Sequence, residues 1–308
     1  MADAPATLQE ACEEFLLYES SVRNLALNTI AGYRNDLARL CRLLGGASLP
    51  LTSVTVTDLR FCIGELSRKK SAASSVNRFI AAVRSLFAYC RRFEYIKSNP
   101  ATELHTVKQP RHLPRFMTES EVNALCSQPE RKTLLWQTRD TAIFEMLYSS
   151  GCRVSELASL RLSDFSADFR SAVVTGKGGK DRRVFFSEQA GKALAGYLRE
   201  RAARIPKNRT VSAVFINMQG TPLTTRGIRY IVSRYSGLEG TDKPVSPHAF
   251  RHTFATSMLS HGADVRVVQE LLGHSSISTT QRYTHITTEQ LIEIYNRAHP
   301  HGGSDENG

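Results

Sequence analysis

The chain has 308 residues, of which 41% are hydrophobic and 22% are charged. This composition excludes a disordered, fibrous or collagen-like chain, and the length is sufficient for two domains with cores of their own. The formal net charge of +11 indicates a polyanionic partner such as nucleic acid.

Neither a targeting segment nor a disulfide framework is indicated. The amino-terminal segment is acidic and helical in pattern, and no apolar run approaches the roughly 18 residues of a membrane span. We therefore expect a cytoplasmic protein. The six cysteines form no C-x-x-C pair, so we expect them to be reduced and partly buried, without structural zinc. They are Cys12, Cys41, Cys62, Cys90, Cys126 and Cys152.

The positive charge is concentrated in one part of the chain. Residues 1–59 carry 4 basic and 7 acidic side chains (net −3), residues 60–115 carry 12 and 3 (net +9), and the remainder therefore holds +5. The basic segment predicts a surface that contacts phosphates. A solvated face, or a surface that binds the ribosome or an acidic protein, would give the same count.

The first part of the chain has apolar residues at helical spacing and almost no strand signal. Asn28 is the expected N-cap of the second helix, and Gly45 is its expected stop. The fourth helix has one apolar side and arginines elsewhere, as expected of a helix that packs on a bundle and faces nucleic acid. The predicted helices are 7–21, 28–46, 56–70 and 75–96, the expected buried side is Phe79, Val83, Leu86 and Phe87, and the tentative DNA contacts are Arg78, Arg84 and Arg91.

A proline-rich basic segment between residues 98 and 116 predicts an extended linker, and the chain after it mixes helices with two short strands. We predict a helical domain at 1–107, a linker at 108–116, an α+β domain at 117–300 and a disordered tail at 301–308. The predicted helices of the second domain are 117–126, 139–153, 188–205, 224–237, 246–262, 265–273, 278–285 and 287–298, with both strands inside 170–187.

The motif GCRVSE at residues 151–156 places a cation in a turn. Gly151 ends one helix and Arg153 lies in the turn that opens the next, where a guanidinium can point two N–H donors at a phosphate and Glu156 can brace it. A surface helix cap with an incidental ion pair has the same pattern.

The turn TGKGGKDRR at residues 175–183 joins the two predicted strands. Lys177 lies at its tip between glycines, which suits a proton donor that must reach a substrate oxygen. Lys180 and Arg182 are tentative contacts to a nucleic-acid backbone. An ordinary hairpin with basic residues for solubility is the alternative, and the spacing is not that of a P-loop.

The segment SPHAFRHTFATSMLSHG at residues 246–262 predicts a helix with an anion site at its start. His248 and Arg251 lie three residues apart in the first turn, where unpaired N–H groups and the helix dipole favour a phosphate. His248 and His252 have the spacing of a zinc pair, but no third ligand is placed by the sequence, so we expect no metal and no role for His252. The expected buried stripe is Phe250, Phe254 and Met258.

The segment LLGHSSISTTQRYTH at residues 271–285 completes a series. Gly273 ends a helix, His274 lies in the next turn, and Tyr283 lies in a Ser/Thr-rich segment of weak helix preference. With these motifs and the ending YNRAHP, the chain resembles the tyrosine recombinases of the phage integrase family, and in particular the Xer-type (XerC/XerD-like) enzymes, over nearly its whole length. The residues that match the family's Arg, Lys, H-x-x-R, His and Tyr series are Arg153, Lys177, His248, Arg251, His274 and Tyr283.

The resemblance implies a mainly α fold. A SAM-like, core-binding helical DNA domain and an α+β catalytic domain with a small sheet would form a C-shaped clamp on double-stranded DNA. It also implies site-specific recombination through a Holliday junction, with resolution of chromosome dimers at a dif-like site during cell division. The enzyme would be cytoplasmic and nucleoid-associated.

The resemblance further implies a metal- and ATP-independent phosphoryl transfer without a cofactor. Arg153 and Arg251 would hold the scissile phosphate while Tyr283 attacks it to form a 3′-phosphotyrosyl bond. The expected assisting roles are deprotonation of the tyrosine by His248, protonation of the 5′ oxygen by Lys177, a phosphate hydrogen bond from His274 and support of the first arginine by Glu156.

The last helix has an apolar stripe that could contact a partner. In the resembling family this tail docks into a neighbouring protomer of a tetramer on two DNA duplexes, and packing on its own domain is the alternative. Activation by a DNA translocase of the division septum is implied only by the resemblance. The tentative protomer contacts are Leu291, Ile294 and Tyr295.

Several other functions share part of this pattern. A type IB topoisomerase uses the same tyrosine chemistry, a phage or integron integrase uses the same fold, and an architectural DNA-binding protein could have lost catalysis. Pairing with a second recombinase or a solitary role is also open, and the DNA target sequence is not readable from the chain.

Overall fold

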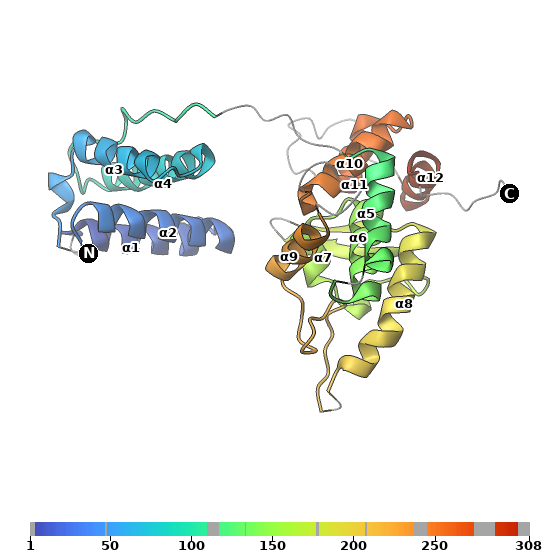
Figure 1. Cartoon of the computed structure of the whole chain (residues 1–308). Coiled ribbons are helices and arrows are strands. Elements are labelled where there is room, and N and C mark those ends of the chain that lie inside the picture. The colour runs from blue at the N-terminus through green and yellow to red at the C-terminus, as the bar shows by residue number, and fades with distance from the viewer. Residues whose placement is uncertain are drawn as a thin grey trace. The chain divides into compact units, whose positions relative to one another are not determined.

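The computed structural model describes residues 4–46, 48–109, 117–132, 134–176, 179–206, 208–236, 245–273 and 287–300. The chain divides into two compact units, Met1–His112 and Leu113–Gly308 (Figure 1). Across the described residues, no helix has both the length and the apolar character needed to cross a bilayer.

The first unit is built from helices, as the sequence predicts. Threonine side chains open two of them with capping boxes, in which Thr7 pairs with Glu10 and Thr55 with Asp58. The elements are α1 (Leu8–Ser21), α2 (Leu27–Leu43), a 3-10 turn (Leu51–Ser53), α3 (Val56–Arg68) and α4 (Ala73–Arg92).

The N-cap prediction for α2 is wrong. The helix begins at Leu27, because the carbonyl of Ala26 already accepts from the backbone N–H groups of Thr29 at 2.7 Å and Ile30 at 3.2 Å. Asn28 therefore lies inside the first turn. The predicted stop is consistent with the structure, since the helix ends at Leu43 and Gly45 lies two residues later with a φ of +100°.

Helix α4 supplies the centre of the first core, and its predicted apolar side is confirmed. Each of these four side chains is at most 1% exposed, and each contributes about 1.5 to 3 kcal/mol relative to an exposed position. Helix α4 packs against α1, α2 and α3. The four residues are Phe79, Val83, Leu86 and Phe87.

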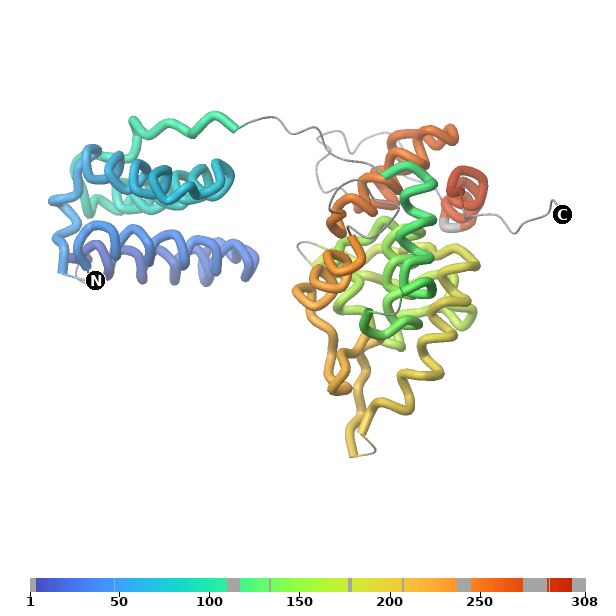
Figure 2. The backbone as a smooth tube through the Cα atoms, viewed as in Figure 1, coloured from blue at the N-terminus to red at the C-terminus, as the bar shows by residue number. Residues whose placement is uncertain are grey.

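The second unit is mainly helical with one small sheet, and Figure 2 follows its backbone. Its elements are α5 (Glu119–Arg131), α6 (Gln137–Ser150), α7 (Val154–Ser159), a 3-10 turn (Leu162–Asp164), β1 (Ser171–Thr175), β2 (Asp181–Phe185), α8 (Glu188–Arg204), α9 (Thr225–Tyr235), α10 (Pro247–Ser260), α11 (Val265–Leu272) and α12 (Thr288–Ala298).

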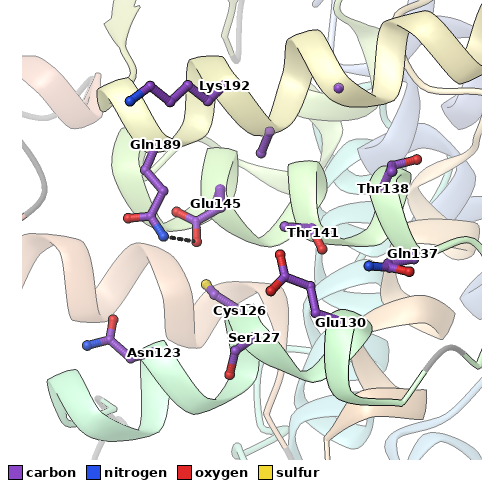
Figure 3. A pocket seen from close by; sticks show the side chains of 12 residues that line it. Asn123, Cys126, Ser127, Glu130, Gln137, Thr138, Thr141, Glu145, Gln189 and Lys192 are labelled. Atoms are coloured by element: carbon purple, nitrogen blue, oxygen red, sulfur yellow. Dashed lines mark hydrogen bonds between the residues drawn. The ribbon is translucent and has the colours of Figure 1, made fainter.

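Helix α6 is the central element of the second core. Its residues from 142 to 150 are all buried, as expected of a helix covered on every side, and it lies between α5 and α8 (Figure 3). It ends at Gly151, whose φ is +57°. A Cβ atom there would lie 2.5 Å from Cδ1 of Phe254, so only glycine fits this close approach and turns the chain into Arg153.

Strands β1 and β2 form an antiparallel hairpin in which Val174 pairs with Arg182. Side chains alternate between the two faces of a strand, so Arg182 shares a face with Val184, which is 1% exposed. Arg183 lies on the other face and is exposed. The face of Arg183 also carries the buried Phe185, so it is the low exposure of its side chain, 12%, that shows Arg182 turned toward the interior of the unit.

Helices α10, α11 and α12 surround a separate small core. The predicted stripe of α10 is confirmed, since Phe250, Phe254 and Met258 are at most 1% exposed. In α12, Tyr295 is 2% exposed and packs in this core, with Leu291 and Ile294 partly buried beside it. The stripe packs on its own unit, and the contact of these residues with another protomer stays a prediction.

Candidate active site

Arg153 is placed by the turn between α6 and α7, where it is the N-cap residue of α7. Its backbone N–H donates to Oε2 of Glu156 at 2.6 Å, and its Nη1 donates to Oε1 of the same carboxylate at 2.7 Å. The carboxylate is 2% exposed, whereas the arginine side chain is 30% exposed. Glu156 thus braces a guanidinium that still has an open side.

Arg182 binds the same carboxylate from the hairpin. Its Nη1 and Nη2 donate to Oε1 and Oε2 of Glu156 at 2.7 and 2.9 Å, a two-pronged contact that fits the planar guanidinium. Only 12% of its side chain is exposed. The prediction that Arg182 contacts DNA is therefore not supported, because both prongs of its guanidinium face a buried carboxylate.

The charge state of Glu156 is set by these neighbours. Burial raises its pKa, but hydrogen bonds from Arg182 and from the backbone and side chain of Arg153, together with the charge of Arg182, lower it more, so the net pKa lies below 4.5. The group is a carboxylate at neutral pH, and it neutralises one of its two arginine partners.

Arg251 enters the site from the second turn of α10. Its Nη1 donates to the carbonyl of Gly151 at 2.8 Å, and its Nη2 donates to the carbonyl of Leu272 at 2.7 Å. Burial, followed by the charges of Arg153 and Arg182, lowers its pKa to about 10. The part of this shift that comes from Arg153 and Arg182 reflects neighbouring positive charge, which a bound anion would relieve.

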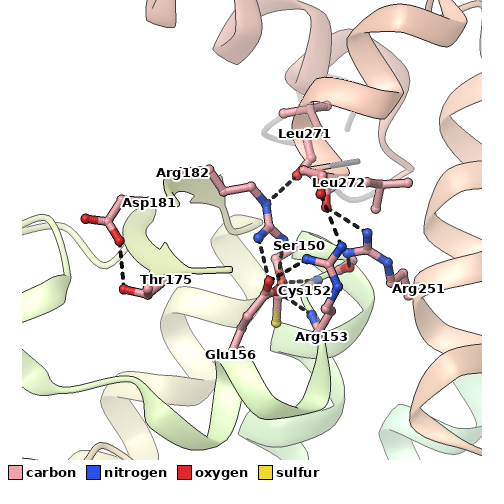
Figure 4. Close-up of polar contacts among 12 residues, drawn as sticks. Ser150, Cys152, Arg153, Glu156, Thr175, Asp181, Arg182, Arg251, Leu271 and Leu272 are labelled. Atoms are coloured by element: carbon pink, nitrogen blue, oxygen red, sulfur yellow. Dashed lines mark hydrogen bonds and ion pairs between the residues drawn. The ribbon is translucent and has the colours of Figure 1, made fainter. Parts of the chain in front are cut away.

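The end of α11 ties these groups together (Figure 4). The last carbonyls of a helix lack partners within the helix. Here Arg182 Nε donates to the carbonyl of Leu271 at 3.1 Å, Arg251 to that of Leu272, and Arg153 Nη2 to that of Gly273 at 3.1 Å. Three successive carbonyls thus each receive a different guanidinium.

The described part of the site carries more positive than negative charge. Arg153, Arg182 and Arg251 contribute three positive charges and Glu156 one negative charge, which leaves +2. A phosphodiester carries one negative charge, and transfer of a phosphoryl group spreads further charge onto its oxygens. The cluster therefore has the surplus positive charge to bind a phosphate diester and to offset the negative charge that grows during its reaction.

The other members of the predicted series are only partly described. His248 lies in the first turn of α10 with an exposed side chain, on the same helix as Arg251. Lys177, His274 and Tyr283 lie outside the described residues. The described chain reaches both sides of the Lys177 turn, where the Gly176 N–H donates to the Lys180 carbonyl at 2.8 Å, and it reaches Gly273 immediately before His274.

The remaining tentative DNA contacts differ in their surroundings. Arg78 is 55% exposed, but it forks onto the buried carboxylate of Asp36 at 2.8 and 3.1 Å. Arg84 is exposed and donates to the carbonyl of Leu104. Arg91 and Lys180 are exposed. Two of these arginines thus also serve the fold of their own unit.

A cavity of the second unit lies apart from the arginine cluster. A space of about 520 Å³ opens between α5, α6 and α8, where Gln189 donates to Oε1 of Glu145 at 3.1 Å (Figure 3). Of the described residues that line it, none belongs to the arginine cluster. The size of the cavity therefore does not identify it as the place of the phosphate chemistry.

Sequence reasoning missed the role of Arg182 and of the α11 carbonyls. The alternation of β2 did not distinguish Arg182 from Arg183, because Arg182 shares one face with Val184 and Arg183 shares the other with Phe185, and both apolar residues are buried. The carbonyl contacts gave no local signal either, since Arg153 and Gly273 are 120 positions apart in the chain and meet only in the folded unit.

Comparisons with known proteins cover both units. The profile of the phage integrase family matches residues 115–290, and that of the phage integrase N-terminal SAM-like domain matches residues 12–93. The tyrosine recombinase XerC of Treponema denticola is 44% identical over 304 residues, which cover 96% of this chain and 100% of the relative. That of Listeria monocytogenes serotype 4b is 38% identical, with 94% and 97% covered.

Solved structures share the fold. The XerH site-specific recombinase bound to its palindromic difH substrate is 20% identical, with a TM-score of 0.70 and coverage of 95% of this chain and 97% of that one. A lambda integrase dimer bound to a core site is 17% identical, with a TM-score of 0.68 and coverage of 91% and 100%.

Proposed function

The chain belongs to the phage integrase family and is a Xer-type tyrosine recombinase, and on this premise we propose that Arg153 and Arg251 bind the scissile phosphate of its DNA substrate. The observation that carries this proposal is the convergence of these guanidiniums on the end of α11 with a surplus of positive charge. Each would hold a non-bridging oxygen and offset the charge that grows in the transition state.

Tyr283 is the proposed nucleophile. Its phenol oxygen would form a bond to phosphorus while the bond to the 5′ oxygen breaks, which gives a 3′-phosphotyrosyl link and a free 5′ hydroxyl. His248 would take the phenol proton and Lys177 would give a proton to the departing oxygen. The phosphodiester's energy is kept in the new bond, so rejoining needs no ATP.

His274 and Glu156 have supporting roles in this proposal. His274 would donate a hydrogen bond to the phosphate, and its place directly after Gly273 supports this, because Gly273 already contacts Arg153. Glu156 would keep the Arg153 guanidinium oriented toward the phosphate through its contacts with the Arg153 backbone N–H at 2.6 Å and with Nη1 at 2.7 Å.

The proposed biological reaction is recombination between two dif-like sites through a Holliday junction, which would resolve chromosome dimers at cell division. The XerC relatives and the XerH–difH complex support this assignment. The exchange would take place in the nucleoid, within a tetramer bound to two DNA duplexes. The tetramer would consist of four copies of this chain, or of this chain together with a paired recombinase. Activation by a DNA translocase of the septum belongs to the same proposal.

A covalent-adduct assay tests the chemistry. The wild-type protein is incubated with a nicked duplex that carries the dif-like site of its own genome, so that the cleaved fragment diffuses away and the intermediate accumulates. We expect a protein–DNA band that resists detergent and disappears with protease, and Tyr283→Phe should give none. An equal band from Tyr283→Phe would exclude this nucleophile, and no band from the wild type would leave only a DNA-binding role.

A further inference from the structure

The contacts of Arg182 join parts of the site that are distant in the chain. Its fork reaches Glu156 on α7 at 2.7 and 2.9 Å, and its Nε reaches the Leu271 carbonyl of α11 at 3.1 Å, while its own backbone lies in β2 (Figure 4). One side chain therefore connects the hairpin, the brace of Arg153 and the helix end that precedes His274.

The geometry requires a guanidinium. Arginine has five N–H donors in a rigid plane, so it can satisfy both carboxylate oxygens and still donate Nε to a carbonyl on another side. A lysine ammonium at this position is a point charge and cannot reproduce that fixed fork.

The surrounding backbone is fitted to this side chain. Gly273 has a φ of +64°, and a Cβ atom there would lie 2.7 Å from Cδ and 3.0 Å from Nε of Arg182. Such contacts are closer than van der Waals packing allows, so the end of α11 can approach the guanidinium only with glycine at this place.

Arg182 also decides how Glu156 is shared. Oε1 of Glu156 accepts from Arg153 and Arg182 at 2.7 Å each, while Oε2 accepts from the Arg153 backbone at 2.6 Å. If Arg182 lost its fork, the carboxylate could rotate toward Arg153 and draw that guanidinium away from the open side of the site.

We propose that Arg182 is a positioning residue that holds Glu156, and through it Arg153, in the orientation that receives the scissile phosphate. This inference rests on the proposed function of Arg153. Arg182 does not itself touch DNA, because it is 12% exposed and its donors are directed to Glu156 and Leu271.

The test separates binding from cleavage in full-length Arg182→Met and Arg182→Lys, with Arg183→Met as the matched control. Arg183 is the next residue of the same strand and lies exposed on its other face. Binding to the dif-like duplex is measured across a salt series. Single-turnover cleavage is measured on saturated nicked duplexes that carry either a normal scissile phosphate or an uncharged methylphosphonate.

We expect both Arg182 variants to bind within about twofold of wild type with an unchanged salt slope, and to cleave the phosphate substrate about 10- to 100-fold more slowly. On the methylphosphonate the ratio of the wild-type rate to the variant rate should shrink several-fold. The uncharged group develops less negative charge in the transition state, so its cleavage depends less on the alignment of Arg153. A general loss of structure would slow both substrates equally. Arg183→Met should cleave bound phosphate substrate at the wild-type rate.

Some outcomes would contradict the role of Arg182 while leaving the proposed recombinase function intact. If wild type forms the adduct and both Arg182 variants cleave normally, or if their rate ratios are equal on the two substrates, Arg182 does not position Arg153. A salt slope lowered by about one would make it a phosphate contact instead. If Arg182→Met does not fold, Arg182→Lys, which keeps the charge and the apolar stem, decides. Absence of any wild-type adduct overturns the proposed function and this inference together.

Discussion

At the scale of single residues, exposure separates the arginines of the site by task. Arg153 and Arg182 bind the same buried carboxylate, but 30% of the first side chain is exposed and only 12% of the second. The sequence placed Arg153 and Glu156 correctly as a braced pair, because a three-residue spacing across a helix start is local. It could not show that Arg182 competes for the same carboxylate.

Glu156 should make the stability of the second unit depend on pH. Its pKa in the folded state lies below 4.5, so its stabilising effect is fully present above that value and is lost as pH falls through the lowered pKa. Glu156→Gln should lower the free energy of unfolding by about 3 kcal/mol at pH 7. The difference in the free energy of unfolding between the variant and wild type, measured by urea unfolding, should become smaller toward pH 3.

The control for this experiment is Glu188→Gln. Glu188 forms an exposed ion pair with Lys192 at 2.8 Å, and exposed pairs contribute little. This variant should track wild type at both pH values. A Glu156→Gln deficit that stays constant from pH 7 to pH 3 would show that the carboxylate charge is not what stabilises the unit.

At the scale of elements, the ends of helices aim the functional groups. Helix α6 ends at Gly151 and α11 at Gly273, both in the left-handed region, and each supplies a carbonyl to an arginine of the site. The sequence predicted both stops from glycine. It misplaced the start of α2 at Asn28, because a backbone carbonyl at Ala26 opens that helix without a side-chain cap.

Replacing Gly151 tests how closely the site depends on such an end. Gly151→Ala should destabilise the unit by about 1 to 2 kcal/mol from the left-handed backbone and by about 1 to 3 kcal/mol more from contact with the Phe254 ring. It should also slow adduct formation, because the Gly151 carbonyl holds Arg251. Thermal unfolding and the adduct assay measure the two effects.

Gly262→Ala is the matched control. Gly262 also has a positive φ, +84°, but a Cβ atom there would meet nothing within 4 Å. It should therefore show the backbone cost alone and cleave at the wild-type rate. If Gly151→Ala and Gly262→Ala lost the same amount of stability, the close approach of Phe254 to the turn would not contribute to the cost of the Gly151 substitution.

Helix α12 shows what apolar spacing in a sequence cannot predict. Its apolar spacing was visible in the sequence, but spacing cannot say which surface the stripe covers. In the structure Tyr295 packs beside Phe185 and Phe254, with ring centroids 5.9 and 6.5 Å apart, in the small core of its own unit. Packing on the chain's own unit and packing on another protomer would both satisfy the same hydrophobic pattern.

At the scale of the whole molecule, charge and composition predicted the partner and the pattern of helices predicted the units. The net +9 of residues 60–115 indicated a polyanion, and the helical first part and mixed second part match the two family profiles. The six cysteines are free, and five of them are buried more deeply than the partial burial expected from the sequence. Composition could not reveal the arginine cluster, because it is assembled from α7, β2, α10 and the end of α11.

The most direct measurement of the central claim is strand exchange between two linear duplexes of different length, each carrying the dif-like site, without metal or ATP. Where the site needs a paired recombinase, that protein is added. We expect recombinant lengths with the wild type and none with Tyr283→Phe. Relaxation of supercoiled plasmids lacking the site, without any recombinant product, would contradict the account and favour a topoisomerase.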